Sequence, residues 1–239
     1  MPNSADDELP HRQNPSPGVH INLGQSNIVL LTVTTEKRDP WLGHIPKHWE
    51  IKPLKTFFGF GKGSNAQELT AEYIADHPGE YPVYSGQTEN DGVMGRISSY
   101  AYDVPKVIFT TTVGARVMTP LVFKGRFSLS QNCLIMRPRN GRVCVRYVFY
   151  QLHPLFAYER AAIPSYMQPS LRMSDLNHYS VACPPTDEQQ GIAEYLDGET
   201  AKLDALLAKV RTAIERLREY RTALISAAVT GQIDVRSGR

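Results

Sequence analysis

The chain has 239 residues, of which 41% are hydrophobic and 21% are charged, and its formal net charge is +2. This composition is typical of a folded protein with one sizeable domain, and it excludes a chain that is disordered throughout. No apolar run approaches the roughly 18 residues that a membrane span needs, and residues 6–8 are acidic where a signal peptide would be basic. We therefore expect a cytoplasmic protein with no membrane partner.

The charge is unevenly distributed along the chain. Residues 41–185 contain fifteen basic and ten acidic side chains, whereas residues 186–229 contain six basic and eight acidic ones. A basic segment suits a polyanionic ligand, and a slightly acidic helix suits a protein partner.

In chain order, residues 1–40 are expected to be a flexible N-terminal leader that includes a β-type run at 28–34. An aromatic and proline-rich segment from Trp41 to Trp49 then marks the start of a domain that ends near residue 185. Within it, turn signals separate the expected strands, and a helix is expected at 145–160 with a kink at Pro154. The expected strands are 81–84, 106–112, 116–123, 133–137 and 179–183.

The sequence after Pro184 and Pro185 predicts one long helix. Thr186 followed by Gln189 has the spacing of a capping box, and Gly231 has the place of a C-terminal cap. The helix would run from about 187 to 229, which corresponds to roughly 65 Å. The predicted fold class is therefore α+β: a target-binding domain at 41–185 made of mixed short strands and helices, a long helix at 186–230 that forms a coiled coil, and a tail at 231–239.

This helix carries a heptad repeat. Leucine or valine recurs at seven-residue intervals, and a second apolar row follows at an offset. Such a repeat is typical of a coiled coil, and a helix of this length would extend beyond any domain formed by the rest of the chain. We therefore expect the repeat to contact another helix through Leu196, Leu203, Leu206, Val210, Leu217, Tyr220 and Leu224, with Ala213 and Ala227 in the second row.

Motifs for catalysis are weak. Residues 59–64 (GFGKGS) lack the ending of a phosphate-binding loop, so a flexible surface loop in which Lys62 touches phosphate is the better interpretation. Asp39 with Glu50 and Lys52 fits a short nuclease pattern that arises often by chance. The seven histidines show no metal-binding spacing, the three cysteines fit reduced packing residues, and no methyl-donor motif is present. We expect no catalytic residue, no metal and no cofactor on this chain.

Polar clusters within or near the ends of the expected strands, and in the loops between them, suit contacts with DNA. Gln and Asn can bond to adenine, Arg to guanine, and Ser, Thr and Lys to phosphate. The same side chains also satisfy loop backbones locally, and only their combination with a basic segment favours DNA. The candidate DNA-binding residues are Lys62, Ser85, Gln87, Arg96, Thr111, Arg116, Gln131, Asn132, Ser165, Tyr166, Gln168 and Arg172.

From Trp41 to about Arg236 the chain resembles the DNA-specificity subunit of type I restriction–modification systems. The resemblance is carried by the order of several short motifs followed by the long helix. These are WLGxIPxHW at 41–49, PVYSG at 82–86, SYMQ at 165–168, PPxxEQ at 184–189 and VTGQID at 229–234.

The resemblance implies a target-recognition domain followed by a spacer helix. A usual member carries two such halves in one chain with antiparallel helices, and this chain carries one. We therefore expect a half-size specificity subunit that homodimerises through residues 187–229 and reads an interrupted palindrome in double-stranded DNA. The resemblance also implies docking of modification (methyltransferase) subunits, which a restriction subunit then joins. S-adenosylmethionine, Mg and ATP would belong to those partners.

Two alternatives stay open at this stage. One is a non-functional fragment of a full-length specificity subunit, which folds but does not assemble. The other is a coiled-coil adaptor or regulator whose domain binds protein rather than DNA.

Overall fold

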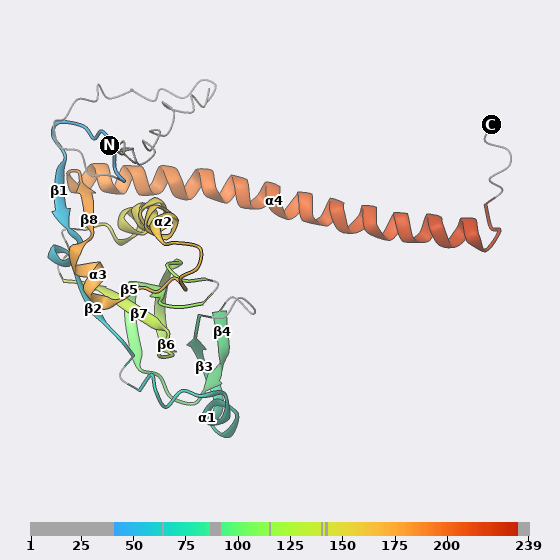
Figure 1. Cartoon of the computed structure of the whole chain (residues 1–239), viewed down its shortest axis with the longest axis horizontal. Helices are drawn as coiled ribbons and strands as arrows, with labels where there is room; N and C mark the ends of the chain where they lie inside the picture. Colours follow the sequence, from blue (N-terminus) through green and yellow to red (C-terminus); the bar gives the residue numbers. More distant parts are fainter. Residues whose placement is uncertain are drawn as a thin grey trace, which may run out of the picture. The chain divides into compact units, whose positions relative to one another are not determined.

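The computed structural model describes residues 41–63, 65–86, 92–114, 116–139, 141 and 143–233. All of them belong to one contiguous unit, Val33–Arg239. The expected leader, the β-type run at 28–34 and Asp39 lie outside the described residues. We use "body" for the described part of residues 41–185, which precedes the long helix in Figure 1.

The body is built on a mixed sheet of six strands in the order β2-β7-β5-β6-β3-β4. All neighbouring pairs are antiparallel except β3 and β6, which run parallel. A separate antiparallel pair joins the two ends of the body, with Glu50 opposite Cys183. The strands are β1 (Glu50–Pro53), β2 (Phe58–Gly61), β3 (Pro78–Tyr84), β4 (Val93–Ile97), β5 (Tyr102–Thr111), β6 (Pro120–Leu129), β7 (Cys133–Pro138) and β8 (Ser180–Cys183).

The two faces of the sheet belong to different hydrophobic clusters. Side chains alternate along a strand, so Ile108 and Met136 face one cluster while Phe109 and Ile135 face the other. Helix α2 (Val145–Ala162) covers the first face with a stripe of buried residues that includes Leu152 and Phe156. This stripe recurs at helical spacing, which explains why the segment is a helix.

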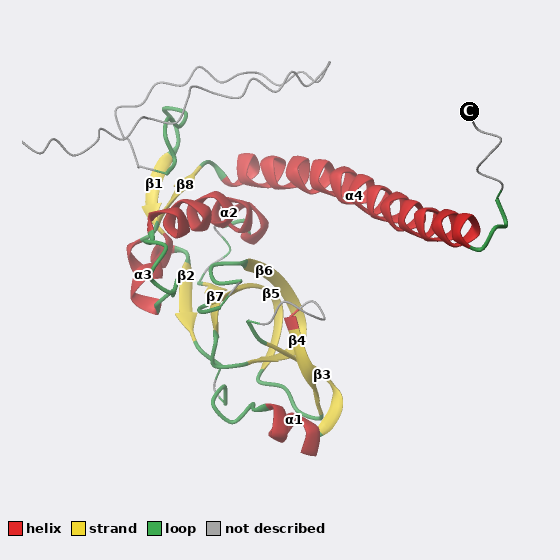
Figure 2. Cartoon of the chain, turned by 45° about the vertical axis from the view of Figure 1, so that its right-hand side comes forward, coloured by secondary structure: helices red, strands yellow, loops and turns green. Residues whose placement is uncertain are grey.

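Two short helices complete the body. Helix α1 (Ala71–Asp76) lies at the end of the sheet near β3 and β4 and packs Ile74 into a small third cluster. Helix α3 (Met173–His178) begins where the Asp175 side chain accepts a hydrogen bond from the backbone N–H of Arg172, at 2.7 Å. A single 3₁₀ turn, η1 (Leu54–Thr56), links β1 to β2. Figure 2 shows these helices in red around the yellow strands.

The expected elements were placed correctly in outline, but β1, β4, α1 and α3 were not among them, and three expected features differ from the structure. The strand expected at 116–123 begins only at Pro120, because Arg116 to Met118 form a turn in which Met118 has a φ of 56°. Residues 58–61 form strand β2 rather than a surface loop. Helix α2 continues through Pro154 to Ala162.

Helix α4 runs from Thr186 to Val229, 44 residues, within a residue of the expected start and at the expected end. The predicted capping box at its start is wrong. Pro185 is the N-cap residue and offers no side-chain hydrogen bond. Glu188 instead accepts hydrogen bonds from Trp49 Nε1, at 2.9 Å, and from His48 Nε2, at 2.9 Å. Two of the motifs that carried the resemblance, 41–49 and 184–189, are therefore in direct contact.

Gln189 joins three elements where α4 begins. It is 1% exposed, its Oε1 accepts from the backbone N–H of Cys144 at 2.9 Å, and its Nε2 donates to the carbonyl of Pro184 at 2.9 Å. Cys144 is the N-cap residue of α2, so the amide of Gln189 satisfies an end of one helix from the first turn of another.

Replacing Gln189 by Ala is expected to lower the free energy of unfolding by about 1–3 kcal/mol, because the N–H of Cys144 and the carbonyl of Pro184 then lose their hydrogen bonds to its buried amide. Chemical denaturation measures the change. Gln190→Ala is the matched control, since Gln190 is exposed and its amide donates to Glu194 one turn further along α4. Equal stability of the two variants would contradict the assigned role of Gln189.

Candidate nucleic-acid interface

A polar cleft lies where loops from four parts of the body meet. One cavity of about 590 Å³ and a neighbouring one of about 490 Å³ share Gln131 and Asn132 in their walls. We call the two together the reading cleft. Its polar lining consists of Lys62, Asn65, Gln67, Glu68, Thr70, Ser85, Thr112, Ser130, Gln131, Asn132, Ser170 and Arg172.

The loops of the cleft are held by hydrogen bonds between backbone groups. Thr112 donates to the carbonyl of Asn132 at 2.9 Å and accepts from the N–H of Leu171 at 2.8 Å, and Val113 pairs with Ser170 in an antiparallel bridge. Ser130 donates to the carbonyl of Tyr84 at 2.9 Å. Four segments far apart in the sequence are thereby fixed side by side, so the cleft is formed before any ligand binds.

Two contacts of the backbone hold the segment that carries Lys62 in place. The hydroxyl of Tyr102 donates to the carbonyl of Lys62 at 2.9 Å, and burial raises the pKa of this phenol, which keeps it a donor. A Cβ on the following residue, Gly63, would lie 2.6 Å from the carbonyl oxygen of Leu129. Only glycine fits so close to β6, which accounts for the glycine-rich sequence at the end of β2.

The structure brings together five of the predicted DNA-binding residues. Lys62, Gln131, Asn132 and Arg172 line the first cavity, and Ser85 lines the second. All except the half-buried Ser85 are exposed. They come from the segment after β2, from the turn between β6 and β7, from the segment before α3 and from the residue that follows β3.

Other predicted residues lie elsewhere. Thr111 is 2% exposed and its hydroxyl donates to the carbonyl of Arg116, so it supports the loop after β5 and has no surface to offer DNA. Arg96 lies on β4 beyond the lining of the cleft and donates to the carbonyl of Glu80 at 2.7 Å. Gln87 lies outside the described residues.

Ser165, Tyr166 and Gln168 belong to the loop between α2 and α3. All three are exposed, Tyr166 at 86% of its surface, and this loop leads directly into Ser170 and Arg172 of the cleft wall. They therefore form a rim next to the cleft. Arg116, half-buried, lies in the turn beyond Gly114, whose φ of 88° lets the loop reverse beside the second cavity.

Asn65 and Gln67 were missed by the sequence analysis. Both line the first cavity beside Lys62, and their amides have the chemistry that suits adenine. Their signal in the sequence is two amide side chains directly after a glycine-rich stretch, which is too common a pattern to be selective.

Burial decides the state of the cysteine behind the cleft. Burial raises the pKa of the Cys133 thiol to about 12, so this residue behind Asn132 stays a neutral packing side chain. Among the described residues, no three His, Cys, Asp or Glu side chains lie close enough to hold a metal ion.

Glu50 and Lys52 of the nuclease pattern form an ion pair with each other on β1. In the part of the chain that the structure describes, no helix could cross a membrane.

Helix α4 presents a second surface, an apolar stripe. Every residue from Ala201 to Ser226 is exposed. The stripe includes Leu207 and Ile214, which the sequence analysis left out and which add a third row beside the two expected ones. Its members are Leu203, Leu206, Leu207, Val210, Ile214, Leu217, Tyr220 and Leu224, each at least 43% exposed.

Leu196 differs from the other heptad residues. It is half-buried and lines an apolar groove of about 380 Å³ together with Trp49, Tyr150 and Ile192. The first heptad position therefore contacts the body of its own chain, and the exposed stripe begins one heptad later.

A polar cleft on a body joined to a helix with an exposed apolar stripe fits a class of protein in which a recognition domain is followed by a helix that contacts a partner. The family model described as "Type I restriction modification DNA specificity domain" matches residues 46–216. The chain belongs to this family. Curated relatives of the chain carry names of type I specificity subunits.

Individual relatives agree with this assignment. The MpnII specificity subunit of Mycoplasma pneumoniae is 32% identical over 131 residues, which cover 54% of this chain and 38% of that protein. The EcoDI specificity subunit of Escherichia coli is 24% identical over 198 residues, covering 80% of this chain and 40% of that one. The chain spans about half the length, or less, of the curated relatives it matches first.

Solved structures share the fold. The S subunit of a type I restriction–modification system from M. genitalium superposes with a TM-score of 0.53 over 67% of this chain and 41% of that one, at 18% identity. A chain from a structure of a type I R-M system gives a TM-score of 0.60 over 82% of this chain and 48% of its own length, also at 18% identity. Both confirm the α+β body followed by a long helix.

Proposed function

We propose that the chain is the DNA-reading component of a type I restriction–modification complex and that the reading cleft contacts the bases of one half-site. The observation that carries this proposal is the cleft itself, which gathers Lys62, Asn132 and Arg172 from separate elements on preformed loops. Exposed amide and guanidinium groups on fixed loops can discriminate base edges. The rim residues Tyr166 and Gln168 lie next to the cleft and extend the contact.

We further propose that two copies pair through the apolar stripe. An exposed stripe three rows wide that runs for about six turns along the helix beyond the body cannot be buried by its own chain. In a two-fold pair centred on Val210, Leu203 of one copy lies opposite Leu217 of the other, and Leu196 lies opposite Leu224.

The charges of α4 support an antiparallel pair. Residues 186–205 contain six acidic side chains and one basic, net −5, whereas residues 206–229 contain five basic and two acidic, net +3. Two identical helices that run antiparallel place the acidic half of each beside the basic half of the other, and parallel helices would place like charges together.

Such a pair would carry one body at each end and would read two identical half-sites, so its target would be an interrupted palindrome. The helix pair would then be the surface to which modification subunits dock, with S-adenosylmethionine on those subunits, and a restriction subunit would join the same complex. This assembly would act in the cytoplasm, where its DNA is.

Binding to a pool of duplexes tests the function. We expect the chain, alone or with its modification subunit, to prefer some sequences over others, and we expect the affinity to fall steeply with salt as phosphate contacts release counterions. Binding that is equal for all duplexes, or absent from DNA while a protein partner is bound, would instead support an adaptor that binds protein.

A further inference from the structure

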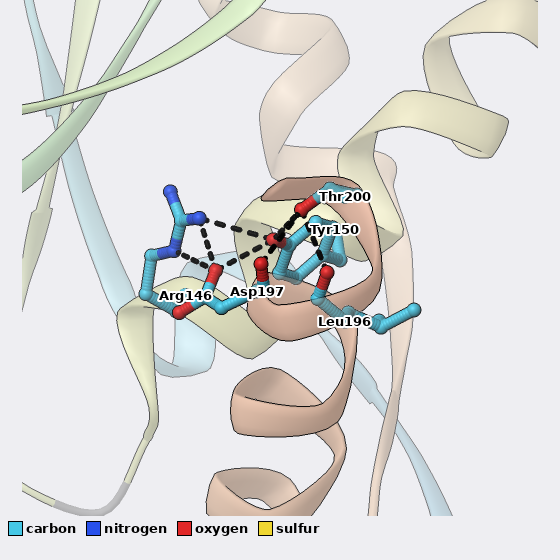
Figure 3. Close-up of polar contacts among 5 residues, drawn as sticks. All are labelled: Arg146, Tyr150, Leu196, Asp197 and Thr200. Atoms are coloured by element: carbon cyan, nitrogen blue, oxygen red, sulfur yellow. Dashed lines mark hydrogen bonds and ion pairs between the residues drawn. The ribbon is translucent and has the colours of Figure 1, made fainter. Parts of the chain in front are cut away.

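A polar network joins α2 to α4 at the side of the body. Asp197 of α4 accepts at a single atom, Oδ1, from three donors: Nε of Arg146 at 2.8 Å, Nη2 of the same residue, and the hydroxyl of Tyr150 at 2.6 Å. The Tyr150 oxygen also lies 3.2 Å from Oγ1 of Thr200, one turn further along α4. Figure 3 shows these side chains pointing at one another from the two helices.

Two aromatic rings of α2 pack against the guanidinium of Arg146, the main donor of this network. The guanidinium of Arg146 lies 4.8 Å from the ring centroid of Phe149 and 5.1 Å from that of Tyr150, and its side chain is 28% exposed. The hydrogen bonds from Arg146 keep the pKa of Asp197 below its usual value, so the carboxylate is charged at neutral pH. Hydrogen bonds to charged groups are directional and stronger than neutral ones.

The network lies at the point where α4 leaves the body. The buried residues of this helix are Gln189 and Ala193, Thr200 is still half-buried, and exposure is continuous from Ala201. The network therefore occupies the last turn that touches the body. Apolar contacts at this joint, such as those of Ile192 and Leu196, exclude water but are non-directional.

A small change of angle at this joint has a large effect at the far end of the helix. The 29 residues from Ala201 to Val229 span roughly 43 Å, so a tilt of about 10° moves that end by roughly 7 Å relative to the body. Successive base pairs are about 3.4 Å apart, so this shift equals roughly two of them.

We propose that Arg146, Tyr150 and Asp197 are positioning residues that fix the angle between body and spacer helix, and that they thereby set which gap between two DNA half-sites the assembly accepts. This inference rests on the proposed function, because a gap matters only if two bodies read one DNA. The three residues do not contact the reading cleft, so they act on spacing and not on base preference.

The test uses the full chain and duplexes that carry two selected half-sites at gaps differing by one base pair. For Asp197→Asn and Tyr150→Phe, we expect a roughly tenfold loss of preference between the best gap and its neighbours, which equals the free energy of one charge-assisted hydrogen bond. Affinity for a duplex with a single half-site should not change. The matched control is Lys202→Gln, which breaks an exposed ion pair with Glu199 on the same helix without touching the body.

A second measurement needs no DNA. Spin labels at the exposed Lys124 and Thr222 report the distance between body and helix end, and the background Leu203→Asp with Leu217→Asp limits the signal to one chain. The distance distribution should broaden in Asp197→Asn and Tyr150→Phe and stay narrow in Lys202→Gln. Unchanged distances and an unchanged gap profile in folded variants would overturn the assignment. A second outcome separates this inference from the proposed function. If the distances broaden but the unaltered chain shows no DNA selectivity, the proposed function and the role in spacing are both overturned. The three residues would then only stiffen the joint between body and helix.

Discussion

Replacing Leu203 and Leu217 together by Asp is expected to convert the chain from a dimer to a monomer. Both side chains are more than half exposed in the single chain and would lie opposite each other in the two-fold pair. A carboxylate in a desolvated helix interface costs several kcal/mol, and the pair contains four, so we expect the dissociation constant to rise by more than roughly a thousandfold. Sedimentation at micromolar concentration measures this change.

The control for this prediction lies on the opposite face of the same helix. Ala208→Asp with Thr212→Asp adds the same charge to exposed positions about 140–180° around the helix from Leu203, and the dimer should survive. Circular dichroism should report unchanged helix content in both double variants. A dimer that persists with Asp at 203 and 217 would place the interface elsewhere, and a monomeric unaltered chain would contradict the two-copy proposal.

Replacing Arg172 by Ala is expected to weaken sequence-selective DNA binding by about 10- to 100-fold, since one good contact to a base is worth about 1–3 kcal/mol. The backbone N–H of Arg172, which caps α3, is retained in the variant, so the fold should hold.

Replacing Lys62 by Ala should affect DNA binding differently. If Lys62 contacts phosphate, affinity falls equally for all sequences and the salt dependence loses about one unit of slope.

The control for the cleft is Arg218→Ala, which removes the same charge from an exposed site on α4 where the guanidinium pairs only with Glu215 among the described residues. Its DNA binding should match that of the unaltered chain. Equal losses in Arg172→Ala and Arg218→Ala would mean that overall charge, and not the cleft, decides the affinity. All these variants should keep the oligomeric state of the unaltered chain.

The sequence predicted the long helix and the general character of the body well, because these depend on local signals. Pro184, Pro185 and Gly231 defined α4 to within a residue at each end. Runs of β-favouring residues between turn signals predicted the central strands β5 and β7, where Ile108 and Phe109 face different clusters. Such local signals depend little on what surrounds the element.

Features that depend on distant partners could not be predicted. Strand β2 is half glycine, and it forms because β7 lies beside it. Thr186 and Gln189 had the spacing of a capping box, but the Gln189 side chain accepts a hydrogen bond from the backbone N–H of Cys144, which is 45 residues away. Thr111 was expected to contact DNA, but it is buried because the loop after β5 folds back over it. Tertiary contacts likewise decide which polar residues line the reading cleft.

The most direct test of the central claim is selection of bound duplexes from a randomised pool, followed by sequencing. If two copies read DNA through their clefts at opposite ends of an antiparallel helix pair, the recovered sequences will share two identical half-sites in inverted orientation, separated by a gap of fixed length. Recovery of a single half-site, of direct repeats, or of no common sequence would contradict that account.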